Sequence, residues 1–563
     1  MKIKKVLTLI VCLVVCISFT FSATGCRADQ NQLPSGTSEN TILTISNYGA
    51  GFGSSWLYKA KARFEKKYAE TSFEEGKKGV FIDIQNTLSS GMGWVNQISG
   101  RTEDIFFTEQ VYYPDAVANK YFLDVTDIVT ENMTLSQGEN KTIESKLSQE
   151  QKDYYKIDGK YYGLPHYSGY FGIVYDIDLF QQRNLYFNHE RTGLIKNSSE
   201  KKSVGLDGLP ETDDDGLPMT YAEMFTLCKA MRNRGITPFI WSGKSRDVYM
   251  GAFINSLYAD YEGLSNFMLN FRLQGVASNL ADSVTVDQEG IITSVGNLHS
   301  EEINLSTGYK VYKQVGRAYA LSFVEQIIKG FYFAEECRDE SFSNSEAQRA
   351  FLESRPYGQN PIAMLIDGNF WDVEASAAFR EIENDYPGEQ WKRENRKFGF
   401  MPFPKATEEQ IDDGLTLFDY LYSCAFINAR IPVSKIKAAK SFLQFLYTDE
   451  SLVEFTVTTN TSKALNYEMS DTETASISKF GQTVWAMKKN ADIAYPFADN
   501  NVYLYSQSDF NMLYNWKSLV GGEVKTSMID AVRKDGLSAA TLFGGFSDYY
   551  TESRWNSLYG EHF

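Results

Sequence analysis

The sequence predicts an α/β protein built from two lobes. The chain has 563 residues, and a single hydrophobic core rarely extends beyond roughly 250–300 residues, so more than one core is expected. Short β-branched and aromatic runs alternate with segments whose apolar residues recur at helical spacing. That alternation is typical of parallel strands covered by helices on both faces of a sheet.

The first 40 residues predict export and a tether. Three lysines precede an apolar run over residues 6–21, and small residues at 22–25 lead to Cys26. The run is shorter than the roughly 20 residues of a membrane-spanning helix, so residues 1–25 are expected to be a signal peptide. The small residues before Cys26 resemble a bacterial lipobox, in which that cysteine is acylated and becomes the mature N-terminus. The alternative is an ordinary signal peptide with an unrelated cysteine. The polar residues 26–40 predict a flexible tether.

The first part of the body alternates strands and helices. Strands are expected over residues 42–46, 80–84 and 105–108 because β-branched and aromatic residues dominate there. Between the first two, Ser54-Ser55 can cap a helix that carries apolar residues at helical spacing. A further helix is expected over residues 115–121.

The second part continues the alternation around a polar stretch. Residues 184–218 are rich in turn formers and predict a surface insertion. Apolar spacing predicts helices over residues 220–234, 253–270, 314–333 and 434–447. Apolar runs predict strands over residues 171–175, 363–366, 398–404 and 421–427.

Charge and cysteine content exclude several classes of partner. The net charge is −17, and removal of the signal lysines makes it more negative, so neither nucleic acid nor an anionic lipid surface is an expected partner. Without the signal, the cysteines are Cys26, Cys228, Cys337 and Cys424, with no paired spacing. We expect the last three to be buried free thiols rather than a disulfide framework. Four histidines leave little for zinc chemistry.

Aromatic residues indicate the kind of ligand. Tyr, Phe and Trp make up 14% of the chain. Phenylalanine is normally a core residue, but tyrosine and tryptophan in loops suit a site that stacks flat, partly polar ligands.

Four segments occur in a recognisable order. They read YGLP (162–165) before GIVYD (172–176), TYAEM (220–224) before GITPF (235–239), AM (363–364) leading to GNFW (368–371), and AAKSFLQFL (438–446) before DE (449–450). In this order, behind a lipobox, the segments resemble the extracellular solute-binding proteins of ABC importers, specifically the sugar-binding group typified by maltose-binding protein.

The resemblance implies a two-lobed periplasmic-binding-protein-like fold with a hinge and a ligand cleft between the lobes. Lobe 1 would comprise residues 41–165 plus about 420–455, and lobe 2 residues 166–419 plus about 456–563. The implied function is capture of an oligosaccharide by a monomeric, lipid-anchored protein on the outer face of the cell membrane, which delivers it to the permease subunits of an ABC transporter. No cofactor and no catalysis are implied.

Candidate ligand residues lie in loops after the predicted strands. Tyr48 and Trp56 flank a glycine-rich loop whose spacing differs from that of phosphate-binding loops, so this loop either faces a sugar or is a plain turn. Glu109 ends the third strand and either bonds hydroxyl groups or lies on a helix surface. Tyr167 follows the first crossing between lobes, and Trp241 follows a strand.

The second lobe supplies the remaining candidates. Trp371 matches the position of the family's ligand-stacking tryptophan, with Asn369 and Asp372 beside it; its alternative is a tryptophan packed between helices. Tyr503 belongs to an aromatic loop that can cap the cleft. Indole and phenol rings cover the apolar faces of a pyranose, while amides and carboxylates pair with its hydroxyl groups.

An acidic turn raises the question of calcium. Glu211, Asp213 and Asp215 occupy the first three ligand positions of an EF-hand template, and Gly216 its glycine position. The twelfth position is Ala222, however, not the expected glutamate. The turn therefore either holds a structural calcium ion or is a solvated acidic turn before a helix.

Two other functions remain open at this point. A surface glycosidase needs two carboxylates about 5–10 Å apart, and Glu109 with Asp372 supply the residue types. An importer receptor for peptides or other amphiphiles would use the same aromatic residues to enclose a different cargo.

Overall fold

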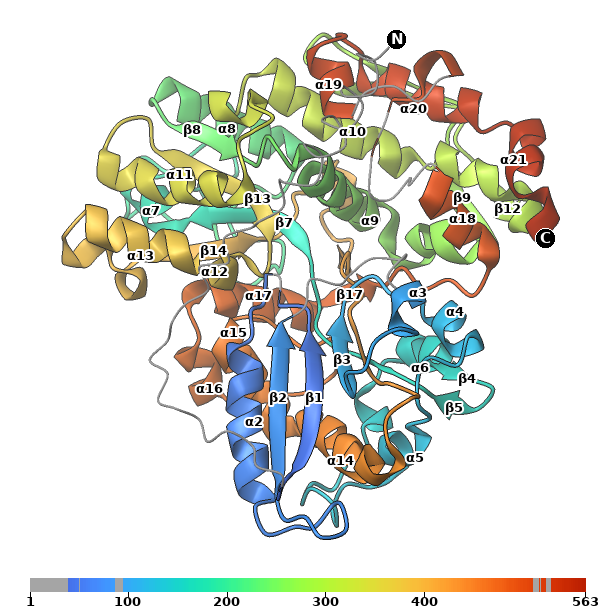
Figure 1. Cartoon of the computed structure of the whole chain (residues 1–563). Helices are drawn as coiled ribbons and strands as arrows, with labels where there is room; N and C mark the ends of the chain where they lie inside the picture. Colours follow the sequence, from blue (N-terminus) through green and yellow to red (C-terminus); the bar gives the residue numbers. More distant parts are fainter. Residues whose placement is uncertain (1–38, 50, 87–94, 510–515, 517, 523–527) are drawn as a thin grey trace, which may run out of the picture.

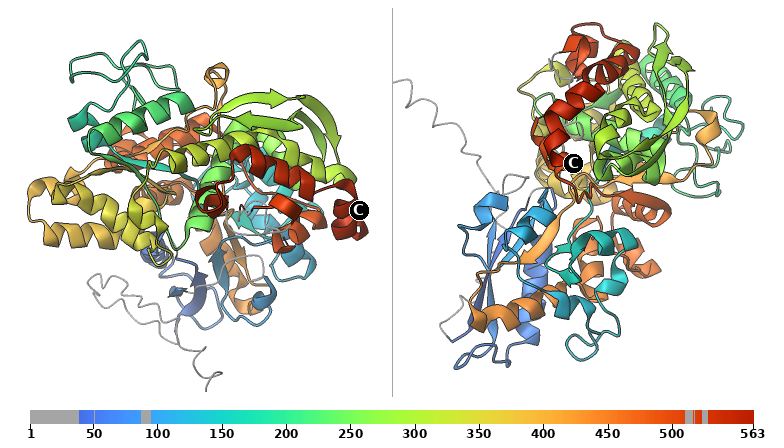
Figure 2. Two further views of the ribbon diagram at one scale, coloured as in Figure 1. Left: turned by 90° about the horizontal axis from the view of Figure 1, so that it is seen from above. Right: turned by 90° about the vertical axis from the view of Figure 1, so that its right-hand side faces the viewer.

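The computed structural model describes residues 39–49, 51–86, 95–509, 516, 518–522 and 528–563. The predicted signal peptide, Cys26 and most of the predicted tether lie outside the described residues. Two lobes, each with its own sheet and covering helices, lie one above the other (Figure 1, Figure 2). The predicted two-lobed α/β fold is confirmed.

The lower lobe of Figure 1 is built on a five-stranded sheet in the order β2-β1-β3-β16-β6. β1 pairs in parallel with β2 and β3, as the alternating pattern predicts, while β16 pairs antiparallel with β3 and β6. All three parallel strands therefore end at the edge that faces the upper lobe. The strands are β1 (Thr41–Asn47), β2 (Val80–Asn86), β3 (Ile105–Thr108), β6 (Leu164–Pro165) and β16 (Cys424–Ile427).

Helices from both halves of the chain cover this sheet. Helix α2 (Ser55–Lys67) buries Phe64, whose ring lies 4.9 Å from that of Phe442 and 5.3 Å from that of Phe445. These partners belong to α14 (Ile436–Leu446), and α15 (Asp449–Thr459) packs on α2 as well. The expected helix over 434–447 is therefore present, and the chain returns to the lower lobe after building most of the upper one.

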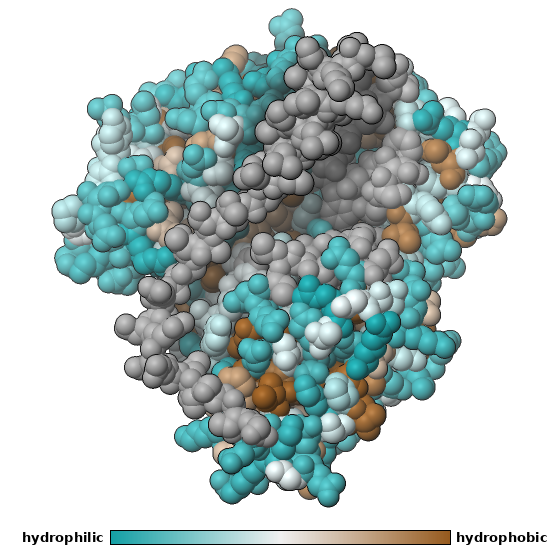
Figure 3. Space-filling view, in the orientation of Figure 1, coloured by the Kyte–Doolittle hydropathy of each residue, from teal (hydrophilic) through white to brown (hydrophobic). Residues whose placement is uncertain are grey.

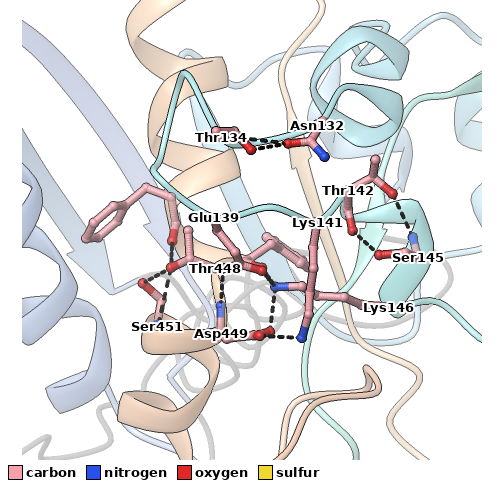
Figure 4. A network of polar contacts seen from close by, with 12 residues as sticks. Asn132, Thr134, Glu139, Lys141, Thr142, Ser145, Lys146, Thr448, Asp449 and Ser451 are labelled. Atoms are coloured by element: carbon pink, nitrogen blue, oxygen red, sulfur yellow. Dashed lines mark hydrogen bonds and ion pairs between the residues drawn. The ribbon is translucent and has the colours of Figure 1, made fainter.

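A polar network fastens this return segment to the lower lobe (Figure 4). Lys146 Nζ lies 2.6 Å from Glu139 Oε1 and 2.8 Å from Asp449 Oδ1, and it donates to the carbonyl oxygen of Tyr447 at 2.7 Å. Lys146 is almost fully buried. Because its three partners satisfy the whole ammonium group, the start of α15 is held against the loop before α6 (Gln149–Tyr155).

The upper lobe contains a four-stranded sheet in the order β14-β7-β13-β8. Only β8 and β13 pair in parallel; β7 is antiparallel to both β13 and β14. The expectation of parallel strands is wrong here, because a strand buried on both faces reads as an apolar run in either orientation. The strands are β7 (Phe171–Asp176), β8 (Thr237–Ile240), β13 (Ile362–Gly368) and β14 (Phe398–Met401).

The helices of the upper lobe occur close to the expected positions, with some differences. Helix α9 starts seven residues earlier than expected and is interrupted at Gly263, whose φ of 69° is non-helical. The segment 184–218 contains no helix or strand, as expected for an insertion. Strands between residues 275 and 303 have no counterpart in the sequence predictions. The helices are α7 (Ile177–Arg183), α8 (Tyr221–Asn233), α9 (Arg246–Arg272), α10 (Val315–Lys329), α11 (Asn344–Tyr357), α12 (Trp371–Glu374), α13 (Ser376–Asp385), α17 (Lys479–Asn490), α18 (Asn501–Asp509), α19 (Met528–Arg533), α20 (Ala539–Tyr549) and α21 (Glu552–Tyr559).

Three segments cross between the lobes and pair with one another. His166 N–H donates to the Ser423 carbonyl at 3.1 Å, and Ser168 N–H donates to the Ser462 carbonyl at 3.1 Å. Gly169 N–H donates to Asp419 Oδ1 at 3.2 Å. These residues follow β6, precede β16 and follow α15, so all three connections run side by side and form the hinge.

The thiols, the longest helices and the surface of the molecule bear on the remaining expectations. Cys228, Cys337 and Cys424 are buried free thiols, as predicted. Among the helices of the described residues, none has the length and apolar character needed to cross a membrane. The face shown in Figure 3 is predominantly hydrophilic, with small apolar areas on the lower lobe. The predicted lobe boundaries stay a prediction.

Candidate ligand site between the lobes

Aromatic rings from both lobes meet beside the hinge. Phe52, in the loop after β1, stacks on Tyr167 of the first crossing with ring centroids 3.9 Å apart. Phe370, directly after β13 of the upper lobe, lies 5.7 Å from Phe52. On the upper side, Phe171 contacts the rings of Phe370, Tyr249 and Tyr420 at 5.4, 5.3 and 5.2 Å. We call these six aromatic residues, together with Tyr48, the inter-lobe cluster.

Two rings of the cluster retain exposed surface. Tyr48 follows β1 in the lower lobe, Tyr249 lies on α9 in the upper lobe, and both are partly exposed. The pKa of Tyr249 is raised first by burial and then by the nearby acidic groups of Glu374, Asp367 and Tyr48. Tyr48 acts in the same way on Tyr167, so it lies near residues of both the hinge and the upper lobe. The predicted ligand contact of Tyr48 stays a prediction.

Glu109 supplies a carboxyl group to the same place. The hydroxyl of Tyr167 donates a hydrogen bond to Glu109 Oε1 at 2.5 Å. Burial raises the pKa of Glu109 to about 8, opposed by that hydrogen bond and supported by the negative charges of Asp419 and Glu374. Glu109 is therefore protonated at neutral pH and can donate as well as accept a hydrogen bond.

Asp419, which the sequence analysis missed, lies on the second crossing segment. Its Oδ1 accepts the backbone N–H groups of Gly169, Leu421 and Tyr422 at 3.2, 3.2 and 2.9 Å. Its Oδ2 is buried and has no partner among the described residues. Burial raises its pKa to about 7. The sequence feature that could have identified Asp419 is a single carboxylate within an apolar run, which is an unusual place for an acid without a cationic partner.

A second acidic pair lies at the end of β13. Gln348 Nε2 donates to Asp367 Oδ2 at 3.0 Å and to Glu374 Oε2 at 2.6 Å. Burial raises the pKa of both carboxyl groups, and the charge of Glu374 raises that of Asp367 further. Together with Glu109 and Asp419 they give the region between the lobes four carboxyl groups whose pKa values are raised by burial. Carboxyl groups can bond the hydroxyl groups of a ligand.

Asn369 connects the upper lobe to the hinge. Its side-chain amide donates to the carbonyl oxygen of Ser168 at 3.0 Å and to Thr461 Oγ1 at 2.7 Å. Its Oδ1 accepts the N–H of Tyr170 at 3.1 Å. Every polar group of this buried amide is oriented toward protein, so its role is to position the strand end. The prediction that Asn369 contacts ligand is wrong.

Trp371 is also a core residue. Its side chain has 0% exposure, and four phenylalanine rings surround it at 5.0–5.9 Å, those of Phe351, Phe379, Phe398 and Phe480. No ring face is left for a ligand, so the predicted stacking role is wrong and the alternative, a tryptophan packed between helices, is correct. The neighbouring Phe370 is the aromatic residue that reaches the inter-lobe cluster.

Three further candidates are occupied by protein contacts. Trp241 is buried against Phe333, with ring centroids 5.1 Å apart. Trp56 is buried, and the Nζ of Lys463 lies 4.5 Å above its ring. Asp372 Oδ1 pairs with Arg393 Nη2 at 3.0 Å. Because these contacts enclose the side chains, the structure does not bring them to the ligand site, which corrects all three predictions.

Tyr503 lies at the other end of the gap between the lobes. It is buried, and its ring lies 5.3 Å from that of Phe271 and 6.5 Å from that of Tyr112. Tyr112 belongs to the lower lobe and donates its hydroxyl hydrogen to the Asn500 carbonyl at 3.0 Å. Tyr503 therefore belongs to a contact between lobes, and its predicted ligand contact stays a prediction.

The acidic turn is not arranged as a metal site. Asp213 forms an ion pair with Lys479, and Asp215 Oδ2 accepts the N–H of Glu211 at 2.8 Å. No group of three or more metal-binding side chains is gathered anywhere in the described part of the chain. The turn uses its carboxylates for its own backbone and for α17, which corrects the calcium ligand set of Glu211, Asp213 and Asp215.

Comparisons with known proteins agree with this architecture. A family model described as bacterial extracellular solute-binding protein matches residues 59–479. The solved structure titled "SBP RafE in complex with raffinose" is 13% identical, with a TM-score of 0.51, covering 91% of this chain and 99% of that chain. A second, titled "Chitin oligosaccharide binding protein", is 15% identical, with a TM-score of 0.51, covering 92% and 100%.

At such identities the structural similarity concerns the fold. No curated protein sequence matches the chain. The family model, however, spans more than half of its length. Two lobes, three paired crossing segments and a cluster of rings and carboxyl groups between them accord with that match. The chain belongs to the bacterial extracellular solute-binding protein family.

Proposed function

We propose that this protein captures an oligosaccharide between its lobes and delivers it, unaltered, to the permease of an ABC transporter. The observation that carries the proposal is the inter-lobe cluster of aromatic rings from both lobes, with the carboxyl group of Glu109 bonded to its member Tyr167 beside the hinge. The titles of the two structural neighbours, which name raffinose and chitin oligosaccharide, agree with a sugar as cargo.

The chemistry of the cluster suits a sugar. A pyranose presents apolar C–H faces, which rings such as Tyr48 and Tyr249 can cover, and hydroxyl groups, which Glu109 can bond in either direction. Two or three stacked rings contribute about 1 kcal/mol each, and each hydrogen bond contributes a similar amount. A binding free energy of about −8 kcal/mol, which corresponds to micromolar affinity, therefore requires several hydrogen bonds in addition to the rings. Such affinity allows both capture and release.

The location follows from the sequence. We propose that Cys26 carries the lipid after removal of residues 1–25, that residues 26–40 form the tether, and that the body acts as a monomer at the outer face of the membrane. Labelling with a radioactive fatty acid tests the anchor: label is expected in the natural chain and should be lost in Cys26→Ser.

A screen against a glycan library tests the cargo. Binding to the folded state raises the melting temperature, so a matching oligosaccharide at 100-fold excess over Kd is expected to stabilise the chain by about 2.7 kcal/mol. The same mixture is then analysed for products. Saturable binding without products supports the receptor, turnover would identify a glycosidase, and stabilisation by peptides alone would identify a peptide receptor.

A further inference from the structure

A second cavity opens on the upper lobe, away from the inter-lobe cluster. It has a volume of about 640 Å³, which lies within the roughly 300–1,000 Å³ of small-molecule sites. Its walls come from the insertion, from the segment after β14 and from α17. None of the residues that line it belongs to the inter-lobe cluster, so a ligand here would not occupy the sugar site.

The floor of this cavity is apolar. Phe400 of β14, Leu217 of the insertion and Met487 of α17 line it, and all three are buried. Leu206, Ile411 and Leu415 extend the apolar surface toward the opening and are partly exposed. An apolar body placed here removes hydrophobic surface from water on both sides of the contact.

The rim is strongly acidic. Six carboxylates line the cavity: Asp207, Glu211, Asp213, Asp214, Asp412 and Asp413. Of these, only Asp213 forms an ion pair within the described residues, with Lys479. The one lysine in the lining, Lys405, is buried and directs its Nζ to Asp260 Oδ1 at 2.9 Å and to the Gly414 carbonyl at 2.8 Å. The field at the opening is therefore negative and attracts a positive head group.

The acidic residues have unequal roles. Asp214 is largely buried and accepts hydrogen bonds from the Thr212 hydroxyl at 2.8 Å and the Asp207 N–H at 3.2 Å, so it holds the loop in shape. Asp412 and Asp413 are exposed and form no ion pair with any described residue. No group of three or more metal-binding side chains is gathered in the described chain. These two carboxylates are available to an organic cation.

We propose that this cavity binds a small organic cation with a hydrophobic body, such as an arylalkylammonium ion. The body occupies the floor formed by Phe400, Leu217 and Met487, and the ammonium group faces Asp412 and Asp413. Neither the apolar body nor the charge alone matches the whole cavity. An inorganic ion leaves the apolar floor exposed to water, and a neutral hydrocarbon leaves the carboxylates without a counter-charge.

Calorimetric titration with matched probes tests the proposal. 2-Phenylethylammonium is expected to bind with a Kd below about 1 mM. 2-Phenylethanol, which lacks the charge, and methylammonium, which lacks the body, are each expected to bind at least tenfold more weakly, since one lost contact class of 1.4 kcal/mol is tenfold. Equal binding of the alcohol, or of methylammonium, would overturn the proposal, as would no binding of the full cation at 10 mM.

Paired variants locate the site. Asp412→Asn with Asp413→Asn is expected to weaken 2-phenylethylammonium binding at least fivefold. The control is Asp535→Asn with Asp548→Asn, a change of equal charge at exposed acids that are not among the lining residues; it should alter Kd less than twofold. An equal loss in both pairs would mean non-specific attraction to an acidic surface and would contradict the proposal.

Discussion

At the scale of single residues, the candidate ligand site contains a buried carboxyl group whose pKa is raised to about 8. Glu109 is almost fully buried, bonds Tyr167 and has no cationic partner among the described residues. Its position after a strand was predictable from the sequence. Its protonation was not, because the pKa depends on burial and on Asp419 and Glu374, which lie far away in the chain.

The replacement Glu109→Gln is expected to change how stability depends on pH. The pKa of Glu109 rises from 4.5 to about 8 on folding, so the folded chain holds a proton that the unfolded chain releases. This contribution is complete below pH 4.5 and is lost as pH rises to about 8. Between pH 5 and pH 8, the free energy of unfolding measured with urea should fall less in the variant than in the natural chain. The difference between the two falls is expected to be on the order of 2–4 kcal/mol. Glu289→Gln, at an exposed position, should keep the natural slope; an unchanged slope in Glu109→Gln would contradict the prediction.

Trp371 illustrates a limit of reading single residues. The motif around it predicted a stacking ring at a strand end, and the strand end is indeed there, but the ring turns into the core while Phe370 faces the cluster. Phe370 is the N-cap of α12 and Trp371 is its first residue, and the sequence does not tell which of these two adjacent rings turns into the core.

Trp371→Ala is therefore expected to lower the free energy of unfolding by about 3–5 kcal/mol, because it empties a site enclosed by four phenylalanine rings. Ligand affinity of the folded variant should stay within twofold of the natural value. Denaturant unfolding and calorimetry measure the two quantities. A large loss of affinity with little loss of stability would restore the stacking role.

At the scale of elements, strands and helices of the lower lobe were predicted well because their local patterns are strong. β1, β2 and β3 alternate with helices and pair in parallel. The upper lobe was predicted less well: strand positions were found, but pairing direction depends on how the chain enters from the crossing segments, a long-range property. The strands between 275 and 303 are short and partly exposed, so no strong apolar pattern marked them.

The crossing segments carry a buried amine. Lys463 is 1% exposed, its Nζ lies 2.5 Å from His166 Nδ1, and it lies 4.5 Å above the rings of Trp56 and of Phe455. Burial holds its pKa well below 10.5. The amine of Lys463 therefore binds its proton less tightly in the folded chain than in the unfolded chain.

Replacement of Lys463 by methionine tests this hinge contact. Because the unfolded chain binds the Lys463 proton more tightly than the folded chain does, the stability of the natural chain falls as pH falls below 10.5. Met cannot titrate. As the pH is lowered from 9 to 7, the free energy of unfolding of Lys463→Met should therefore rise relative to that of the natural chain, by at most about 1.4 kcal/mol per pH unit. Thermal unfolding at both values measures the change. Lys489→Met, at an exposed position of α17, is the control, and parallel curves for Lys463→Met and the natural chain would refute the prediction.

At the scale of the whole molecule, contacts between the lobes favour the arrangement of the hinge in which the lobes are together. Glu150 of α6 in the lower lobe pairs with Arg272 of α9 in the upper lobe, with Oε1 and Nη2 2.5 Å apart. Both residues line a cavity of about 400 Å³. Burial raises the pKa of Glu150 to about 7, although Arg272 opposes this. Such a contact exists only while the lobes are together.

Arg272→Met is thus expected to weaken ligand binding two- to fivefold, the effect of about 0.5–1 kcal/mol from a partly exposed ion pair. The loss should shrink at pH 5.5, where Glu150 is protonated in both proteins. Calorimetry at pH 8 and pH 5.5 gives the comparison. Arg338→Met removes a pair formed within the upper lobe and should leave affinity unchanged; equal losses in both variants would argue against a latch between lobes.

Capture of a cargo from both lobes is tested most directly by one measurement. Calorimetry with an oligosaccharide from the screen is performed on Tyr48→Ala, in the lower lobe, and on Tyr249→Ala, in the upper lobe. Each ring is worth about 1 kcal/mol, so both variants should bind five- to tenfold more weakly, while Tyr58→Ala, an exposed residue on α2, should bind normally. A loss confined to one lobe, or to neither, would contradict capture between the lobes.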